Sequence, residues 1–494
     1  MVTYKNDLAR TGQNLTETVL TPSNVNVNTF GLLRVLPVDG KVDAQPLYLS
    51  QLSIGASAHD VAYVASEGDS VYAFDVNSGA ILWHSVLLPA GETLSDDHGC
   101  DQVVPNIGIT STPVIDRTAG TIFVVAMSKD ASGAYHQRLH ALSLTSGAEL
   151  ANSPVDIAAS YPNTSGTTSF APGQYEERAA LLLLNGTIYT SWTSHCDIGP
   201  YSGWIIAYSE TTLAQSAVLN VAPNSNSGPA IWMAGGGPAA DSSGNIYLLT
   251  ANGAFETTLN AAGFPSGQDY GNSFLRITTT AGAPAVADYF TMWNEVSESS
   301  GDVDLGSGGG MLLPDLSDAN GTTRQLIVGA GKDGNLYVVD RNQMGKFNSS
   351  SNQIWQELDG ALPGGVWATP AYFNNTVYYG DVGGTLKAFP IAQAMLATTP
   401  SSQSATSFGY PGSAPAISAN GSSNAILWAH ENASAAVLHA YDATNLANEL
   451  YNSNQAANGR DQFGSPNKFI TPTIADGKVL VGTTNGVGVF GLLN

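Results

Sequence analysis

The chain has 494 residues, and its 17 Lys and Arg against 40 Asp and Glu give a formal net charge of −23 at pH 7. This acidity, without any basic run, argues against nucleic-acid binding, because polyanions are repelled. A hydrophobic fraction of 43% can build a large core and excludes disorder as the dominant state. No apolar stretch reaches the roughly 18 residues of a membrane-spanning helix. The two cysteines exclude a disulfide-rich scaffold and a CxxC haem or metal motif.

One pattern recurs along the chain: a short run around Pro, followed by three further aliphatic or aromatic runs between turns. In the first repeat these runs cover residues 44–48, 61–64, 70–75 and 80–83. Later repeats begin at residues 111–115, 179–184, 237–240, 311–313, 368–371, 414–416 and 471–473. Runs rich in Val, Ile, Tyr and Thr between Gly, Asp and Asn turns are typical of strands. From Pro46 to Pro472 the repeats average about 61 residues, which exceeds the roughly 40–45 that a propeller blade needs.

The two ends of the chain complement each other. The last repeat has runs at 479–481 and 487–490 and lacks a fourth, while an unassigned run at 30–36 precedes the first repeat. Pairing these two would close a ring and remove an exposed sheet edge. The sequence therefore predicts an all-β fold, an eight-bladed β-propeller of four-stranded blades closed by an N-terminal strand that pairs with the last blade. We expect one domain over 1–494, with an N-terminal segment at 1–40 and blades at 41–494.

Helical periodicity is almost absent, and only residues 391–396 and 445–450 are short helix candidates. In a four-stranded meander running outwards, the fourth-to-first and second-to-third connections lie on one face, which we call the loop face. The long connections at 89–106, 256–270 and 294–310 fall on this face, whereas the opposite turns, such as 185–186, are short. Loops on a rigid frame often carry function. We therefore expect the functional site on the loop face.

Residues 71–83 and 335–341 read VYAFDVNSGAILW and NLYVVDR. These phrases resemble the repeats of pyrroloquinoline quinone (PQQ)-dependent, or quinoprotein, alcohol dehydrogenases, which are eight-bladed propellers, and the similarity covers most of the chain. The repeat is more specific for the fold than for the chemistry, because scaffold proteins also carry it. The resemblance implies PQQ, Ca²⁺ or a lanthanide ion, and an alcohol or sugar as the substrate.

Five positions match the family's chemical residues one at a time. Asp197 stands at the family's metal-binding Glu, Asn252 at its amide ligand, and Asp302 at the extra acid of lanthanide-type members. Asp304 resembles the carboxylate that serves as metal ligand and as base, and Lys332 resembles the cation that polarises the quinone carbonyl. Such oxygen ligands suit a hard cation. The resemblance thus implies a metal site at Asp197, Asn252, Asp302 and Asp304, with Asp304 and Lys332 catalytic.

The positions that would enclose the quinone match less completely. Cys100 stands alone where the family has two adjacent cysteines, and the Arg that usually follows them is absent near 106–108. Residues 234–237 hold no aromatic at the position of the Trp on which PQQ stacks, and Trp232 lies out of register. Trp367 follows Val where the family has Asn. By resemblance, Cys100, Trp232, Lys332 and Trp367 are the candidate cofactor contacts.

Each of these residues also has a simpler interpretation. Asp302, Asp304, Asn252 and Lys332 all stand in turn-like sequences, where solvated side chains are common. Cys100 and Cys196 both fall on the loop face, where they could form a disulfide or act as metal-bound or reactive thiols beside His195. The aromatic loop 199–204 could line a sugar or aromatic substrate site, or pack between blades.

Three functions follow from these patterns. We favour a PQQ- and Ca²⁺-dependent dehydrogenase that oxidises an alcohol or sugar and passes electrons to an external acceptor, since no haem motif exists. A second is a propeller without quinone that binds a glycan or protein partner. A third is a metal-assisted lyase or hydrolase on the same carboxylates. Residues 1–10 contain no signal segment, so the protein is either cytosolic or a mature form without its signal peptide. Few Lys and abundant Ser and Thr favour the second interpretation, a secreted or periplasmic protein.

Overall fold

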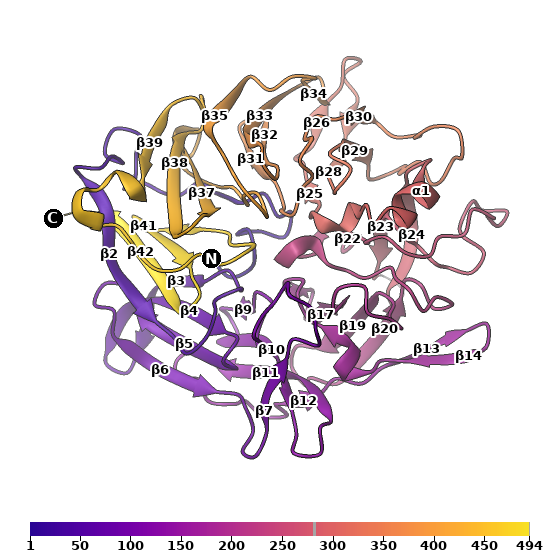
Figure 1. Ribbon diagram of the computed structural model, residues 1–494, viewed down its shortest axis with the longest axis horizontal. Helices are drawn as coiled ribbons and strands as arrows, with labels where there is room; N and C mark the ends of the chain where they lie inside the picture. Colours follow the sequence, from indigo (N-terminus) through magenta and orange to yellow (C-terminus); the bar gives the residue numbers. More distant parts are fainter. Residues whose placement is uncertain (280–282, 494) are drawn as a thin grey trace.

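The computed structural model describes residues 1–279 and 283–493. Eight antiparallel sheets of four to six strands stand as blades in a ring, which confirms the predicted eight-bladed propeller (Figure 1). Each blade begins near the axis and runs outwards as a meander of neighbouring strands. Many side chains on both faces of these strands are buried, because each blade packs between two others.

The strands of the first four blades agree with the repeats in the sequence. They are β3 (Leu47–Ile54), β4 (Ser57–Ser66), β5 (Ser70–Asp75) and β6 (Ile81–Val86); β9 (Val114–Asp116), β10 (Thr121–Lys129), β11 (Tyr135–Ser143) and β12 (Val155–Asp156), extended by β7 (Thr93–Asp96) and β8 (Asn106–Ile107); β16 (Leu182–Leu184), β17 (Thr187–Ser191), β19 (Trp204–Ser209) and β20 (Gln215–Asn220); and β21 (Ala239–Ala240), β22 (Ile246–Leu249), β23 (Ser273–Thr278) and β24 (Ala285–Thr291).

The remaining blades follow the same order. They are β25 (Met311–Leu312), β28 (Leu326–Gly329), β29 (Leu336–Asp340) and β30 (Gln356–Leu358); β31 (Ala371–Phe373), β32 (Thr376–Gly380), β33 (Thr385–Ala392), β34 (Met395–Leu396) and β35 (Ser402–Ser407); β36 (Ala416–Asn420), β37 (Ser423–Asn432), β38 (Ala436–Asp442) and β39 (Glu449–Asn452) with β1 (Gln13–Asn14); and β40 (Thr473–Ala475), β41 (Lys478–Gly482) and β42 (Gly486–Leu492) with β2 (Phe30–Pro37).

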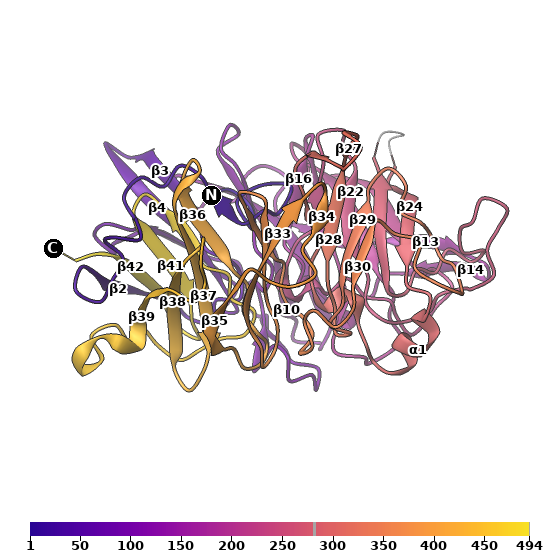
Figure 2. The same cartoon turned by 90° about the horizontal axis from the view of Figure 1, so that it is seen from above.

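Smaller elements decorate this ring. Three two-stranded sheets pair β13 (Ser160–Asn163) with β14 (Gly166–Ser169), β15 (Tyr175–Glu176) with β18 (Thr193–Ser194), and β26 (Leu316–Ser317) with β27 (Thr323–Arg324). The short helices are α1 (Glu295–Ser300), η1 (Pro172–Gln174), η2 (Met233–Gly235), η3 (Leu305–Ser307), η4 (Ser453–Gln455) and η5 (Ala457–Gly459). Figure 2 shows α1 and the β26–β27 hairpin on opposite faces of the ring, with α1 on the loop face.

Both helix candidates from the sequence are wrong. Ile391 and Leu396 pair across a tight turn between β33 and β34, and residues 445–450 form a turn that leads into β39. Apolar spacing over so few residues cannot separate a helix from a hairpin. The helix that does form, α1, lies in the connection 294–310 and has the polar sequence EVSESS, which carries no apolar stripe. Among the described residues, no helix is long and apolar enough to cross a membrane.

The ring closes as the sequence predicts. β2 is the fourth strand of the last blade and pairs antiparallel with β42, from Phe30 opposite Leu492 to Pro37 opposite Gly486. The first residue of β2 also anchors the core: the ring of Phe30 lies 5.0 Å from that of Tyr451, 5.4 Å from that of Trp428 and 6.3 Å from that of Phe490. The closing strand therefore contributes both a ladder of hydrogen bonds and buried apolar surface.

Residues 1–14 form a belt along the inner ends of the blades, and the chain begins near the centre of the ring (Figure 1). Main-chain oxygens of this belt accept hydrogen bonds from the first strands of six blades, donated by the amides of Tyr48, Ile115, Ala240, Leu312, Tyr372 and Ile417. Asn14 reaches a further blade through the carbonyl oxygen of Ile474. The belt thus satisfies backbone groups at the inner edges, which would otherwise be buried without partners.

Two buried cations hold the belt in place. Lys5 Nζ donates to the carbonyl oxygens of Pro370, at 3.1 Å, and Pro415. Arg10 donates to Thr3 Oγ1 at 2.7 Å, to the Tyr4 carbonyl oxygen at 2.9 Å and to the Pro238 carbonyl oxygen at 2.9 Å. Both side chains are fully buried, so their loss would leave unpaired carbonyl groups in the interior.

The belt can be tested by replacing Arg10. We expect Arg10→Ala to lower the free energy of unfolding by about 3 kcal/mol, because the hydrogen bonds of a buried charged donor disappear. The measurement is urea unfolding followed by tryptophan fluorescence. Arg117→Ala, at an exposed arginine, is the control and should change the stability little. Equal losses in both variants would show that the belt does not stabilise the ring.

Candidate functional site

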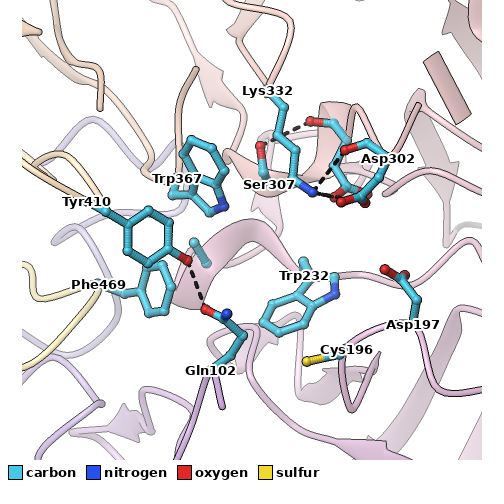
Figure 3. Close-up of a pocket in the computed structure, with 12 residues that line it drawn as sticks. Gln102, Cys196, Asp197, Trp232, Asp302, Ser307, Lys332, Trp367, Tyr410 and Phe469 are labelled. Atoms are coloured by element: carbon cyan, nitrogen blue, oxygen red, sulfur yellow. Dashed lines mark hydrogen bonds and ion pairs between the residues drawn. The ribbon is translucent and has the colours of Figure 1, made fainter. Parts of the chain in front are cut away.

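A cavity of about 350 Å³ opens on the loop face, and we call it the main pocket (Figure 3). Its lining residues are Gln102, Cys196, Asp197, Trp232, Ala234, Asp302, Asp304, Ser307, Lys332, Trp367, Tyr410 and Phe469. All of them lie on fourth-to-first or second-to-third connections, from the one before the second blade to the one before the eighth. The pocket is therefore assembled from segments spread around the whole ring.

Most of the residues selected from the sequence meet in this pocket. Six of them line it, namely Asp197, Trp232, Asp302, Asp304, Lys332 and Trp367. The other two lie beside it: Asn252 contacts both Asp302 and Asp304, and Cys100 is bonded to Cys196. The structure thus brings the eight candidates together, although their chemical roles stay predictions.

Lys332 and two aspartates form the polar side of the pocket. Lys332 Nζ lies 3.0 Å from Asp302 Oδ1 (Figure 3). It also lies 2.5 Å from Asp304 Oδ2. The other oxygen of Asp304, Oδ1, accepts the backbone N–H of Asn252 at 2.8 Å, and Asn252 Nδ2 donates to Asp302 Oδ1 at 3.2 Å. These contacts link the fourth and fifth blades through charged groups.

Burial and ion pairing shift the pKa of Asp304 in opposite directions. Burial raises the pKa of the Asp304 carboxyl above its usual value, although Lys332 and the backbone N–H of Asn252 oppose the increase. Burial alone would lower the pKa of Lys332, but the carboxylates of Asp304 and Asp302 outweigh it and raise that pKa. The pocket therefore holds a stable ammonium ion beside a carboxyl group whose proton affinity is increased.

The oxygen donors suit a hard cation in chemical type. Asp197, Asp302 and Asp304 supply carboxylates and Asn252 an amide oxygen, which are ligands that Ca²⁺ and similar ions prefer. Within residues 1–279 and 283–493, however, no three His, Cys, Asp or Glu side chains form a ready coordination shell. The ammonium group of Lys332 contacts both Asp302 and Asp304 instead. The donor set fits a cation, and Lys332 would have to release these oxygens to it.

Cys100 and Cys196 form a disulfide across 96 residues of sequence, which confirms the first of the two alternatives for these cysteines. The bond ties the loop before the second blade to the third blade. Near these cysteines in the sequence, His98 and His195 stack their rings at 4.0 Å. Burial lowers the pKa of His195 to about 3, so this imidazole is neutral at physiological pH.

Flat groups form the other walls of the main pocket. Trp367 meets Tyr410 edge to face at 5.5 Å, and Tyr410 meets Phe469 in the same way at 6.1 Å. The hydroxyl of Tyr410 donates to Gln102 Oε1 at 2.8 Å, which joins the connection before the seventh blade to that before the second (Figure 3). Together with Trp232, these rings give the pocket planar apolar surfaces beside its charged side, a combination that fits a planar, charged cofactor.

Sequence reasoning missed Gln102, Ala234, Ser307, Tyr410 and Phe469. A signal for the two aromatic residues exists: Tyr410 and Phe469 shortly precede the Pro that opens a repeat, as Trp367 does. That position is the end of a fourth-to-first connection, where the chain returns to the axis. A search for aromatic residues shortly before the Pro of a repeat would have identified this aromatic wall.

No family model and no curated protein matches the sequence. Among solved structures, the quinohemoprotein alcohol dehydrogenase of Comamonas testosteroni superposes with a TM-score of 0.66 and 14% identity, over 99% of this chain and 80% of that one. The quinohemoprotein alcohol dehydrogenase ADHIIG of Pseudomonas putida HK5 gives a TM-score of 0.64 and 13% identity, over 99% and 80% of the two chains. At such identities the likeness shows the fold, and at this level it supports the resemblance to quinoproteins.

The disulfide gives a stability prediction. Replacing both cysteines, Cys100→Ser with Cys196→Ser, should lower the free energy of unfolding by about 4 kcal/mol, because a closed loop of roughly 100 residues restricts the unfolded chain. Denaturant unfolding measures this change. Tris(2-carboxyethyl)phosphine should destabilise the wild type by a similar amount and leave the double variant unaffected. The prediction would be contradicted if the reductant reached and reduced the disulfide of the wild type but left its free energy of unfolding unchanged.

Proposed function

We propose that this protein is an oxidoreductase that uses PQQ and a hard cation, Ca²⁺ or a lanthanide, to oxidise an alcohol or sugar hydroxyl. The observation that carries the proposal is the Asp304–Lys332 ion pair at 2.5 Å, inside a pocket that also has planar aromatic walls. A base and a cation side by side are what removal of a hydroxyl proton next to an electron acceptor requires.

The residues divide into two groups around this pair. Asp197, Asn252, Asp302 and Asp304 would hold the cation through oxygen atoms. Trp232, Trp367 and the Cys100–Cys196 disulfide would enclose the quinone, and Lys332 would neutralise negative charge on it. When bound, PQQ would supply a two-electron acceptor that the protein's side chains lack.

Asp304 would take the proton of the substrate hydroxyl. Its Oδ1 is held by the backbone N–H of Asn252 at 2.8 Å, which leaves Oδ2, now paired with Lys332, as the oxygen that can accept a proton. The increased pKa of Asp304 favours this task, because a base works best when its pKa approaches the working pH. Lys332 would keep the carboxyl ionised until the cation binds.

The charge of the pocket favours an order of binding. Asp197, Asp302 and Asp304 face the single ammonium group of Lys332 among the lining residues, so the charged groups sum to two negative charges. A quinone that carries carboxylates would be repelled by this excess unless a cation compensated it. We therefore propose that the cation binds before the quinone or together with it.

We also propose that the protein acts outside the cytosol and delivers electrons to an external acceptor. The Cys100–Cys196 disulfide supports an oxidising compartment such as the periplasm or the extracellular space. The sequence has no CxxC haem motif that could carry electrons within the chain.

Quinone binding is the direct test. In calorimetric titrations we expect PQQ to bind with a micromolar dissociation constant when Ca²⁺ is present, and about tenfold or more weakly without it. The loaded protein should then reduce an artificial dye when given an alcohol or sugar. Failure of PQQ to bind at micromolar concentrations with Ca²⁺ or a lanthanide would disprove the proposal.

The role of Asp304 gives a second test. Asp304→Asn should lower the turnover number of the reconstituted protein by about a hundredfold or more, because the amide cannot accept the hydroxyl proton. PQQ loading is measured in parallel by absorbance, so that rates are compared per bound cofactor. Asp315→Asn, at an exposed carboxylate, is the control and should retain wild-type turnover. A similar turnover number in both variants would remove Asp304 from the mechanism.

A further inference from the structure

A second hollow, of about 510 Å³, lies beside the main pocket. Its lining includes Tyr201 from the third blade and Asn252 with Phe255 from the fourth. Helix α1, before the fifth blade, contributes Val296 and Ser299. This hollow belongs to the loop face as well, since all these residues lie on its connections.

The two hollows are joined at shared residues. Asp197 lines both of them, and its Oδ1 accepts a hydrogen bond of 2.8 Å from the hydroxyl of Tyr201 in the second. Asn252 lines the second hollow while its backbone N–H holds Asp304 in the first. A ligand bound at Asp304 could therefore extend past Asp197 into the second hollow.

The lining of the second hollow combines aromatic rings with short polar groups. Tyr201 and Phe255 provide the rings, and Ser227, Ser299 and Ser300 provide hydroxyl groups. Rings suit the C–H faces of a sugar, and hydroxyl and amide groups suit its edges, whereas an alkyl chain offers these polar groups no hydrogen bond. Val296 is 61% exposed at this site, an apolar side chain that a bound ligand could cover.

The charge of the lining indicates a neutral ligand. Asp197 and Glu295 are its carboxylic acids, and no Lys or Arg stands among the lining residues. A sugar acid or a phosphorylated sugar would meet carboxylates and no compensating cation. A neutral hydroxylated ring meets hydrogen-bonding partners without this penalty.

Hydrogen bonds hold helix α1 against the segment 252–253, which also contacts Asp304 in the main pocket. Glu295 is buried, and its Oε1 accepts a hydrogen bond of 2.5 Å from Ser299 Oγ. The same Ser299 Oγ accepts a hydrogen bond of 3.1 Å from the backbone N–H of Gly253. The hollow is thus held in shape by the same segment, 252–253, that contacts Asp304, and it needs little rearrangement to accept a ligand.

We propose that the second hollow is a subsite for a neutral sugar ring, so that the substrate is an oligosaccharide or glycoside whose neighbouring unit presents a hydroxyl to Asp304. The assignment of the reacting unit rests on the proposed function; the sugar subsite rests on the lining described above. A small alcohol would contact the main pocket alone and leave the larger hollow unused.

Phe255 and Phe264 provide a matched pair for the test. Both are partly buried, pack against the same apolar cluster and approach Tyr289, at 6.2 and 5.6 Å between ring centroids. Phe255 lines the second hollow, whereas Phe264 does not. Phe255→Ala and Phe264→Ala should therefore cost similar stability, and Phe255 alone should affect sugar binding.

Binding is measured by calorimetry on protein without quinone, with cellobiose, maltose and lactose compared with glucose and 1-hexanol. We expect at least one disaccharide to bind about tenfold more tightly than glucose, because it fills both hollows. Phe255→Ala should weaken that disaccharide about fivefold and Phe264→Ala should not. Phe255→Leu, which keeps apolar packing but lacks the ring, should show the same loss if Phe255→Ala does not fold.

Several results would overturn the subsite. They are disaccharides that bind no better than glucose, equal effects of the two alanine variants, or 1-hexanol that binds more tightly than every disaccharide in a manner dependent on Phe255. PQQ with Ca²⁺ is titrated into the same preparations. If PQQ fails to bind while the Phe255-dependent disaccharide affinity is present, the proposed redox function falls and the sugar subsite stands.

Discussion

Closure of the ring is the constraint on which the rest of the structure depends. β2 completes the last blade through its pairing with β42, and the belt at residues 1–14 bonds to the inner strands of most blades. The residues that line the main pocket range from Gln102 to Phe469 in the sequence, so they would lie far apart if the ring were open. One contact makes this plain: the hydroxyl of Tyr410 donates to Gln102 at 2.8 Å across 308 positions of sequence.

The main pocket is rich in charged residues, whereas the chain as a whole has few. Charged residues make up only 12% of the chain, yet Asp197, Asp302, Asp304 and Lys332 line one cavity of about 350 Å³. Lys332 stabilises the carboxylates by direct contact, and burial works against them. Such a balance between burial and pairing is typical of sites that bind ions or move protons. The neighbouring hollow is less charged and more aromatic, which suits recognition of a ligand.

The sequence predicts much of the fold and identifies residues of the candidate site, but these two predictions rest on different signals. The eight repeats and the pairing of 30–36 with the last blade follow from apolar runs and turns, which are local patterns. The belt has no such pattern, because its main chain bonds to a different blade every few residues and its order arises only in the closed ring. The contact of Lys332 with Asp304 likewise joins separate turns. Helix α1 has a polar sequence and is held by Glu295, Ser299 and the backbone of Gly253.

The pairing of β2 with β42 also affects how the molecule can be made. β2 leaves the ribosome long before its partner strand at Gly486–Leu492, because most of the described chain lies between them. At about 5–20 residues per second, the closing strand waits on the order of half a minute or more with its edge exposed. Such an edge can pair with another chain. The Pro at its end, Pro37, limits this risk because it has no N–H to donate. The feature that closes the ring is thus also the point at which a newly made chain is most open to association with its neighbours.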